Sequence, residues 1–253
     1  MHKIKKLLRI IGTGFCFTCF GVGGLLASLF IFPFIILFNP DAEKRQASAQ
    51  RMVKRMFHSF VSLMVFLGII SFKVKGAEYI KEAEGKIVIA NHPSLIDVVL
   101  IVATLPRATC IVKQAVIDNP FMRAIVKTAG YIANKDPELF LKKCESKLNK
   151  GETLVLFPEG TRSVPGETIS FQRGAANIAL RARADFLPVK VSCQPATLTK
   201  SERWYQVPDI KPNFEIAFQP PLSLDTMSSF HESNSIASRK LTRDLEGYFI
   251  ELL

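Results

Sequence analysis

The chain has 253 residues, enough to bury one good core, and 48% of them are hydrophobic, with a mean hydropathy of +0.21. This apolar content is high for a fully soluble protein and indicates contact with a membrane. The formal charge of +11 calls for an anionic partner, either nucleic acid or anionic lipid head groups. The sequence has no zinc-like Cys/His spacing and no basic block interleaved with aromatic residues, so we expect lipid, no nucleic acid and no metal. The five cysteines are scattered and odd in number, which argues against a disulfide framework and fits a reducing compartment.

A long apolar stretch follows a basic segment near the N-terminus. Residues 1–9 carry four Lys and Arg side chains, and Ile10 to Phe38 contains no charged side chain. Ile10 to Phe32 alone would form about 35 Å of helix, which is long enough to cross a bilayer. The alternative is a cleaved signal peptide, but the stretch is too long for one and no A-x-A-like site ends it. We therefore expect a retained membrane anchor.

A second apolar run, Met56 to Phe72, is joined to the first by a mostly basic segment. The positive-inside tendency keeps such a segment on the cytoplasmic side, together with the basic N-terminus. This favours a helical hairpin that dips into one leaflet, or a tilted first helix with the second lying in the interface; a single true span is a further alternative. The sequence thus predicts membrane-anchoring helices in residues 1–72 and a second domain in residues 73–253, on the cytoplasmic side of the membrane.

The second domain alternates short apolar runs with helical patterns, which predicts an α/β fold with a largely parallel central sheet flanked by helices. The start and stop signals are clearest at Asp136-Pro137 and Gly151, which bracket one helix. The predicted strands are Phe72 to Lys75, Ile87 to Ala90, Thr109 to Val112, Thr153 to Phe157, Phe186 to Ser192 and Phe214 to Phe218. The other predicted helices are Leu95 to Thr104, Phe121 to Ala129, Phe171 to Ala184 and Ser235 to Leu252.

Asn91 and His92 follow the apolar run Ile87 to Ala90, and Pro93 suits the first position of a helix that would place Asp97 one turn in. If His92 lies in the turn before this helix, Asp97 can accept a hydrogen bond from one ring nitrogen and leave the other as a base. Such a pair suits the deprotonation of a hydroxyl that attacks an acyl group. The alternative is that His92 caps a helix and Asp97 merely interacts with the helix dipole.

A second group of polar residues follows the predicted strand that ends at Phe157. In the sequence Pro158-Glu-Gly-Thr-Arg-Ser163, Gly160 allows a tight turn, Thr161 offers a hydroxyl, and Arg162 offers a planar fork for a phosphate. Glu159 could orient Arg162 or a substrate hydroxyl. The carboxyl ends of strands in open α/β sheets are where ligands bind. The alternative is a plain turn with an exposed arginine.

Together, Asn91-His92-x4-Asp97 and Phe157-Pro-Glu-Gly-Thr-Arg162 resemble motifs of the lysophosphatidic acid acyltransferase (PlsC-type glycerolipid acyltransferase) family. Two shorter stretches support the resemblance: Phe171-Gln-Arg-Gly174 looks like the family's basic F-x-x-G stretch, and Leu187-Pro-Val189 looks like its apolar-Pro motif. The resemblance covers roughly residues 70 to 220, and the N-terminus looks like the family's membrane-anchoring helices.

The resemblance implies an O-acyltransferase that moves a fatty acyl group from acyl-CoA or acyl carrier protein to a lysolipid hydroxyl, without a cofactor or a protein nucleophile. It implies that His92 is the general base and that Asp97 holds its tautomer. The expected substrate-binding residues are Asn91, Lys135, Glu159, Gly160, Thr161, Arg162 and Arg173. The first candidate acceptor is 1-acyl-sn-glycerol-3-phosphate, which would give phosphatidic acid.

One stretch departs from the family pattern. The family usually has Gly, hydrophobic residues and then Arg between the two main motifs, whereas Gly130-Tyr-Ile-Ala-Asn-Lys135 is one residue shorter and ends in Lys. Since Lys is a point charge and not a bidentate fork, the acceptor could be another lysolipid, a specialised glycolipid or a polyene-type lipid. Two further alternatives are a lipid thioesterase or transacylase that uses the same pair, and a non-catalytic basic protein of the membrane surface.

Overall fold

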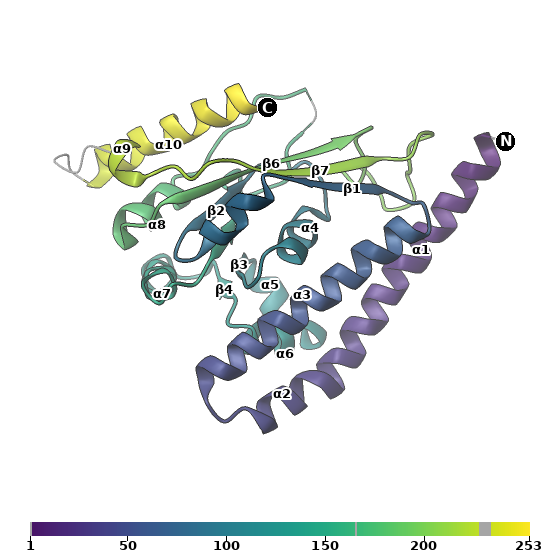
Figure 1. Cartoon of the computed structure of the whole chain (residues 1–253), viewed down its shortest axis with the longest axis horizontal. Helices are drawn as coiled ribbons and strands as arrows, with labels where there is room; N and C mark the ends of the chain where they lie inside the picture. Colours follow the sequence, from purple (N-terminus) through teal and green to yellow (C-terminus); the bar gives the residue numbers. More distant parts are fainter. Residues whose placement is uncertain (1, 165, 228–233) are drawn as a thin grey trace.

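A computed structural model describes residues 2–164, 166–227 and 234–253 and shows an α/β fold around a seven-stranded sheet (Figure 1). The strand order is β1-β7-β6-β2-β5-β3-β4. The strands are β1 (Ser71–Lys75), β2 (Ile87–Ala90), β3 (Thr109–Val112), β4 (Ile132–Ala133), β5 (Leu154–Leu156), β6 (Phe186–Gln194) and β7 (Asn213–Phe218). Strands β6, β2, β5, β3 and β4 are parallel, while β7 pairs antiparallel with β6 and parallel with β1. The predicted fold class is confirmed.

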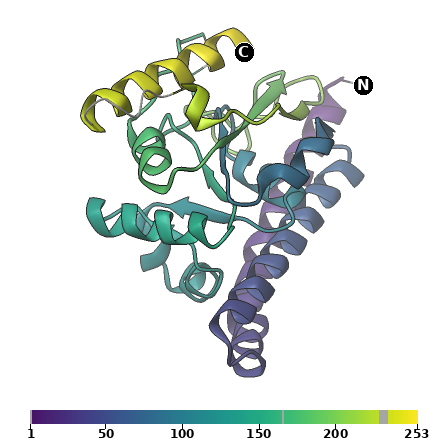
Figure 2. The same ribbon diagram turned by 60° about the vertical axis from the view of Figure 1, so that its left-hand side comes forward.

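Helices cover both faces of the sheet, and for this reason the sequence of β2 is apolar throughout. Val88 and Ala90 belong to a core cluster on the side of the N-terminal helices, and Ile87 and Ile89 to a cluster on the other side. A strand buried on both faces needs no polar alternation. The helices that follow the sheet strands are α4 (Asp97–Thr104), α5 (Gln114–Asp118), α6 (Pro120–Thr128), α7 (Pro137–Asn149), α8 (Gly174–Ala182), α9 (Leu224–Met227) and α10 (Asn234–Leu252). Figure 2 shows α10 and α8 on one side of the sheet and the long N-terminal helices on the other.

The N-terminal region forms the predicted helical hairpin. Its first arm is α1 (His2–Leu26), a π-helical turn (Ala27–Ile31) and α2 (Phe32–Phe38); its second arm is α3 (Ala42–Phe66). Lys3–Phe38 is the one described helical run that is long and apolar enough to cross a membrane. The aromatic rings of Phe17 and Phe20 pack against Phe60 across the two arms, with centroid distances of 5.7 and 4.7 Å.

The second arm, α3, also packs on the sheet domain. Val61 and Met64 are buried in the same apolar cluster as Leu100 of α4 and Val88 of β2. Each large apolar side chain that is fully buried contributes about 1.5–3 kcal/mol. Residues 1–72 and 73–253 therefore share one core. The apolar side chains of the hairpin that remain exposed belong mainly to α1 and α2.

The structure adds the short elements β4, α5 and α9, which the sequence did not predict, and the largest shifts of predicted boundaries are at the starts of three helices. The helix expected from Pro93 or Leu95 begins at Asp97, after an irregular turn, and the helix expected from Phe171 begins at Gly174. The second apolar run is the end of a longer helix that begins at Ala42, because the side chain of Asp41 accepts a hydrogen bond from the Lys44 N–H at 2.7 Å and caps it.

Candidate active site

His92 and Asp97 lie at the carboxyl end of β2, next to the carboxyl end of its neighbour β5. The Nδ1 atom of His92 is 2.9 Å from Oδ2 of Asp97, and the Ser94 N–H donates to the same oxygen at 2.6 Å. The turn Pro93–Ile96 before α4 lets the ring fold back over the start of the helix. The hydrogen bond that the sequence predicted between these two side chains is confirmed.

The imidazole of His92 is held on a second side by Phe157, which directly follows β5. The two rings stack at a centroid distance of 4.2 Å with an interplanar angle of 24°. Since Nδ1 faces Asp97, Nε2 is the nitrogen left for another partner. The side chain of His92 is 20% exposed and is among the residues that line a cavity.

Asp97 is completely buried at the start of α4. Burial raises the pKa of its carboxyl to about 6, against the hydrogen bond and charge of His92 and the hydrogen bond from Ser94, which lower it. Its second oxygen, Oδ1, has no hydrogen-bond partner among the described residues. A carboxylate in this setting can stabilise a positive charge on the imidazole that it orients.

Glu159 joins the two motifs across the sheet edge. Its Oε1 atom accepts hydrogen bonds from the His92 N–H and the Ser163 hydroxyl, both at 2.9 Å, while the Ser163 N–H donates to the His92 carbonyl at 2.8 Å. The chain turns between them at Gly160, whose φ of +69° favours glycine. The predicted turn is present, and the buried Glu159 contacts the backbone of His92 rather than Arg162.

Arg162 reaches toward the segment that follows β6. Its Nη1 atom donates to the carbonyl oxygens of Leu198 and Thr199, at 3.0 and 2.8 Å. The carbonyl of Leu198 also accepts from the Leu95 N–H at 3.0 Å, so one carbonyl contacts both motifs. Arg162 is half-buried, and its predicted contact with substrate stays a prediction.

A cavity of about 440 Å³ opens beside His92. Its walls are mainly apolar, from Ile111, Val112, Phe140, Leu141, Leu156, Phe157, Ala175 and Ile178. The polar part of its lining includes Lys113, Asn134, Gln172 and Asn177. Lys113 and Asn134 follow β3 and β4 at the same carboxyl edge, a position at which ligands bind in such sheets. The sequence analysis missed both, although strand ends were a signal that could have found them.

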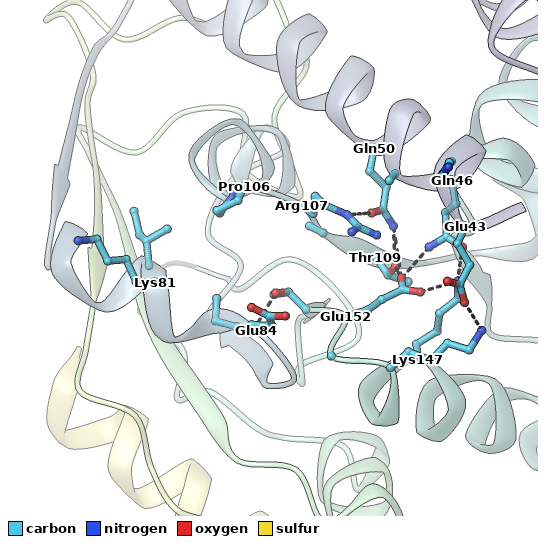
Figure 3. Close-up of a pocket in the computed structure, with 18 residues that line it drawn as sticks. Glu43, Gln46, Gln50, Lys81, Glu84, Pro106, Arg107, Thr109, Lys147 and Glu152 are labelled. Atoms are coloured by element: carbon cyan, nitrogen blue, oxygen red, sulfur yellow. Dashed lines mark hydrogen bonds and ion pairs between the residues drawn. The ribbon is translucent and has the colours of Figure 1, made fainter. Parts of the chain in front are cut away.

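A second cavity, of about 480 Å³, lies at the opposite, amino edge of the sheet (Figure 3). It is lined by Gln46 and Gln50 of α3, by Arg107 and Thr109 at the start of β3, and by Glu152 before β5. Its side chains make hydrogen bonds and ion pairs with one another. Among the described residues, no group of three or more His, Cys, Asp and Glu side chains is placed to hold a metal ion.

Known acyltransferases are similar to this chain in sequence. A family model described as Acyltransferase matches residues 71–192, which include both motifs. The chloroplastic 1-acyl-sn-glycerol-3-phosphate acyltransferase LPAT1 of Arabidopsis thaliana is 28% identical over 203 residues, covering 74% of this chain and 52% of that protein. The 1-acyl-sn-glycerol-3-phosphate acyltransferase of Helicobacter pylori is 32% identical over 111 residues, covering 41% of this chain and 47% of that protein.

These findings support the PlsC-type glycerolipid acyltransferase family for this chain. It spans about half the length of the curated relatives it matches. The crystal structure of PlsC, the 1-acyl-sn-glycerophosphate acyltransferase from Thermotoga maritima, covers 98% of both chains with a TM-score of 0.67 and 24% identity, so the likeness to it shows the fold.

The remaining residues predicted for the PlsC-type site fall into two groups. Asn91 is buried, and its side chain bonds the backbone of Val191 in β6 twice, donating to its carbonyl at 2.8 Å and accepting from its N–H at 2.7 Å. Its polar atoms thus hold β2 beside β6. Lys135, Thr161 and Arg173 are exposed and are not among the lining residues of the 440 Å³ cavity. A role for them in substrate binding stays a prediction.

Proposed function

We propose that the protein transfers a fatty acyl group from a thioester donor, acyl-CoA or acyl carrier protein, to the free hydroxyl of a lysolipid. The first candidate acceptor is 1-acyl-sn-glycerol-3-phosphate, with phosphatidic acid as the product. The observation that carries the proposal is the hydrogen bond between His92 and Asp97 at the mouth of an apolar cavity.

In the proposed reaction, Nε2 of His92 removes the proton of the acceptor hydroxyl as its oxygen attacks the thioester carbonyl. Asp97 keeps the proton on Nδ1 and stabilises the imidazolium that forms. The tetrahedral intermediate then collapses: the C–S bond breaks, the new ester C–O bond remains, and the imidazolium returns the proton to the thiolate sulfur. Proton transfer of this kind contributes typically about 10²-fold to 10⁴-fold in rate. The apolar walls around Ile111 and Phe140 suit an acyl chain.

Products formed from a panel of lysolipids and the two donors, identified by mass, test this proposal. The full chain should form an acylated lipid and release free thiol in equal amounts, and His92→Ala should lose the activity while it still binds membranes. Free fatty acid without acylated lipid would point to a thioesterase instead. Retained function in the double variant His92→Ala and Asp97→Ala would contradict catalysis by this pair.

One observation favours an acceptor of lower charge than lysophosphatidic acid. A phosphomonoester carries nearly two negative charges at neutral pH. Among the described lining residues of the cavity, apart from His92, Lys113 is the one ionisable side chain, whereas Asn134, Gln172 and Asn177 carry neutral amides. Amides suit the hydroxyl and carbonyl groups of a glycolipid or of a phosphodiester lysolipid.

The acceptor panel separates the two candidates. A preference for lysophosphatidic acid that falls with Lys113→Ala, but not with Lys142→Ala on the exposed face of α7, would support the phosphomonoester. A preference for a neutral or singly charged lysolipid that Lys113→Ala leaves unchanged would support the second candidate.

The exposed apolar side chains of α1 and α2 favour membrane association. We propose that the sheet domain lies on the cytoplasmic side, because the basic N-terminus and the basic start of α3 would then stay in the cytoplasm. Protease digestion of sealed vesicles of known orientation tests this placement. Cleavage from the periplasmic or luminal side alone would contradict it.

A further inference from the structure

The segment that joins β6 to β7 contains a loop, residues 199–211, that lies beside the N-terminal half of α1 (Figure 1). The loop is thus next to the hairpin although about 190 residues separate the two in the sequence. Nothing in the proposed reaction uses it.

Three contacts fix the loop on α1. The Arg9 guanidinium donates to the carbonyl of Pro208 at 2.9 Å and also to that of Asp209. Lys6 forms an ion pair with the Asp209 carboxylate at 2.8 Å. The third contact is at Gly14, where a Cβ would lie 3.0 Å from the ring of Trp204, so a glycine lets the indole rest directly on the helix.

The outer side of the loop is apolar and aromatic. Trp204, Tyr205 and Ile210 are 47%, 41% and 67% exposed. Leu7 is seven residues before Gly14 and so lies on the same face of α1, where it is 56% exposed. Exposed apolar side chains of α1 and of the loop are therefore neighbours, on either side of the polar contacts that Lys6 and Arg9 make with Pro208 and Asp209.

The charged residues around this surface are mainly cationic. Lys200, Arg203 and Lys211 are exposed in the loop. The two acidic side chains of the loop are already engaged: Glu202 accepts from the N–H and hydroxyl of Thr199, and Asp209 pairs with Lys6. Lys3 and Lys5, which are exposed in the first turn of α1 and precede Lys6, add further positive charge near the loop.

We propose that residues 199–211 form a second membrane-binding element, which places Trp204, Tyr205 and Ile210 in the interface of an anionic bilayer beside α1. Trp and Tyr are enriched at this depth because their rings are amphipathic, and Lys and Arg side chains extend from it to anionic head groups. Because the ring of Trp204 lies against Gly14 of α1, the bilayer that takes up the exposed side chains of α1 can also take up those of the loop.

The loop also sets where the bilayer lies relative to the catalytic motifs. It begins at Thr199, whose carbonyl, with that of Leu198, accepts from Arg162, and the Leu198 carbonyl accepts from Leu95, three residues after His92. The membrane contact therefore connects through one short segment to both motifs. With the loop in the interface, this segment sets the distance between the cavity and the lipid surface.

Trp204 is the single tryptophan of the chain, so its fluorescence reports on this loop alone. The full chain is reconstituted into vesicles of phosphatidylcholine and phosphatidylglycerol, with and without lipid brominated on the acyl chain near the head group. We expect bromine to quench the emission and the vesicles to protect Trp204 from acrylamide. Emission unchanged by bromine, in protein that floats with the vesicles, would overturn the proposal without affecting the proposed chemistry.

Paired variants test the apolar contribution. Ile210→Ser should weaken flotation with anionic vesicles about three- to tenfold, the effect of one partly buried apolar side chain. Ile250→Ser in α10, on the far side of the sheet and similarly exposed, should leave flotation unchanged. Equal flotation of both variants would overturn the proposal. Protection from acrylamide that depends on protein concentration in micelles, without bromine quenching, would assign the surface to a second copy of the chain and overturn it as well.

Discussion

The two cavities of the molecule have similar volumes, about 440 and 480 Å³, but their polar groups are arranged in opposite ways. At the amino edge, Glu152 accepts hydrogen bonds from Thr109 at 2.7 Å, Gln46 at 2.6 Å and Lys147 at 2.9 Å (Figure 3). Gln50 accepts from Arg107 at 3.1 Å. These groups satisfy one another and tie α3 to the sheet.

At the carboxyl edge, the polar contacts instead leave one reactive atom available. Asp97, Phe157 and Glu159 contact Nδ1, the ring face and the backbone of His92, and none of these contacts uses Nε2. The comparison shows that many charged side chains in a cavity indicate catalysis less well than one oriented side chain whose second polar atom has no partner. Variants at the two edges should therefore separate catalysis from stability.

The largest expected effect is that of Asp97→Asn on turnover. Asn cannot stabilise an imidazolium, so we expect kcat to fall about 10²-fold to 10⁴-fold, with circular dichroism unchanged. In the wild-type protein, kcat should fall as the pH drops below about 6, because the carboxylate of Asp97 then takes up a proton and no longer stabilises a positive charge on the imidazole. Stopped-time assays across pH measure both effects, and a flat profile in the wild-type protein would contradict the assigned roles.

The next effect is that of Glu159→Ala, which removes the acceptor that joins the two motifs. Loss of two hydrogen bonds to a buried carboxylate should lower the free energy of unfolding by about 2 kcal/mol. The backbone of His92 should also lose its position, which should lower kcat about 10-fold to 100-fold. Ser163→Ala removes one of the two donors and should show a smaller loss in both measurements. A kcat equal to that of the wild-type protein would mean that Glu159 positions nothing.

At the amino edge, Glu152→Ala should destabilise the protein without changing kcat. Burial acts to raise the pKa of Glu152, but the hydrogen bonds from Thr109, Lys147 and Gln46 lower it overall, so the ionised carboxylate stabilises the fold. We expect the free energy of unfolding to fall by about 2 kcal/mol in urea titration, because Lys147 loses its ion-pair partner. Glu138→Ala, which breaks an exposed ion pair with Arg181, should cost less than about 1 kcal/mol. A loss of kcat at constant stability would contradict the structural role.

The last prediction concerns the dependence of stability on pH. The pKa of Asp97, about 6, exceeds its ordinary value of 3.8, so the folded state binds this proton more tightly than the unfolded state. Relative to Asp97→Asn, the wild-type protein should therefore gain stability as the pH falls from about 7 to about 4, by less than about 3 kcal/mol. The destabilisation that comes from burying the ionised carboxylate is fully present above the pKa of the folded state. A difference that grows with rising pH would contradict the burial argument.

The sequence predicted those elements whose signals are local. Asp136 accepts from the Leu139 N–H at 3.1 Å and starts α7, and Gly151, with φ +75°, follows its end, as expected from cap residues a few positions apart. The apolar runs that became β2 and β5 were found for the same reason, since a strand buried on both faces is apolar throughout. The contact between His92 and Asp97, which are five residues apart, could also be predicted from the sequence.

The tertiary structure alone decided which partner each polar side chain took. Asn91 bonds Val191, Arg162 bonds Leu198, and Lys113 reaches the cavity through the pairing of β3 with β5. Residue type tells what a side chain can bond, but its partner depends on which strands lie next to each other. The sequence by itself determined the contact between His92 and Asp97 and the α/β framework, because those depend on neighbours along the chain. The packing of segments 36 to 100 residues apart determined how that pair is held and what surrounds it.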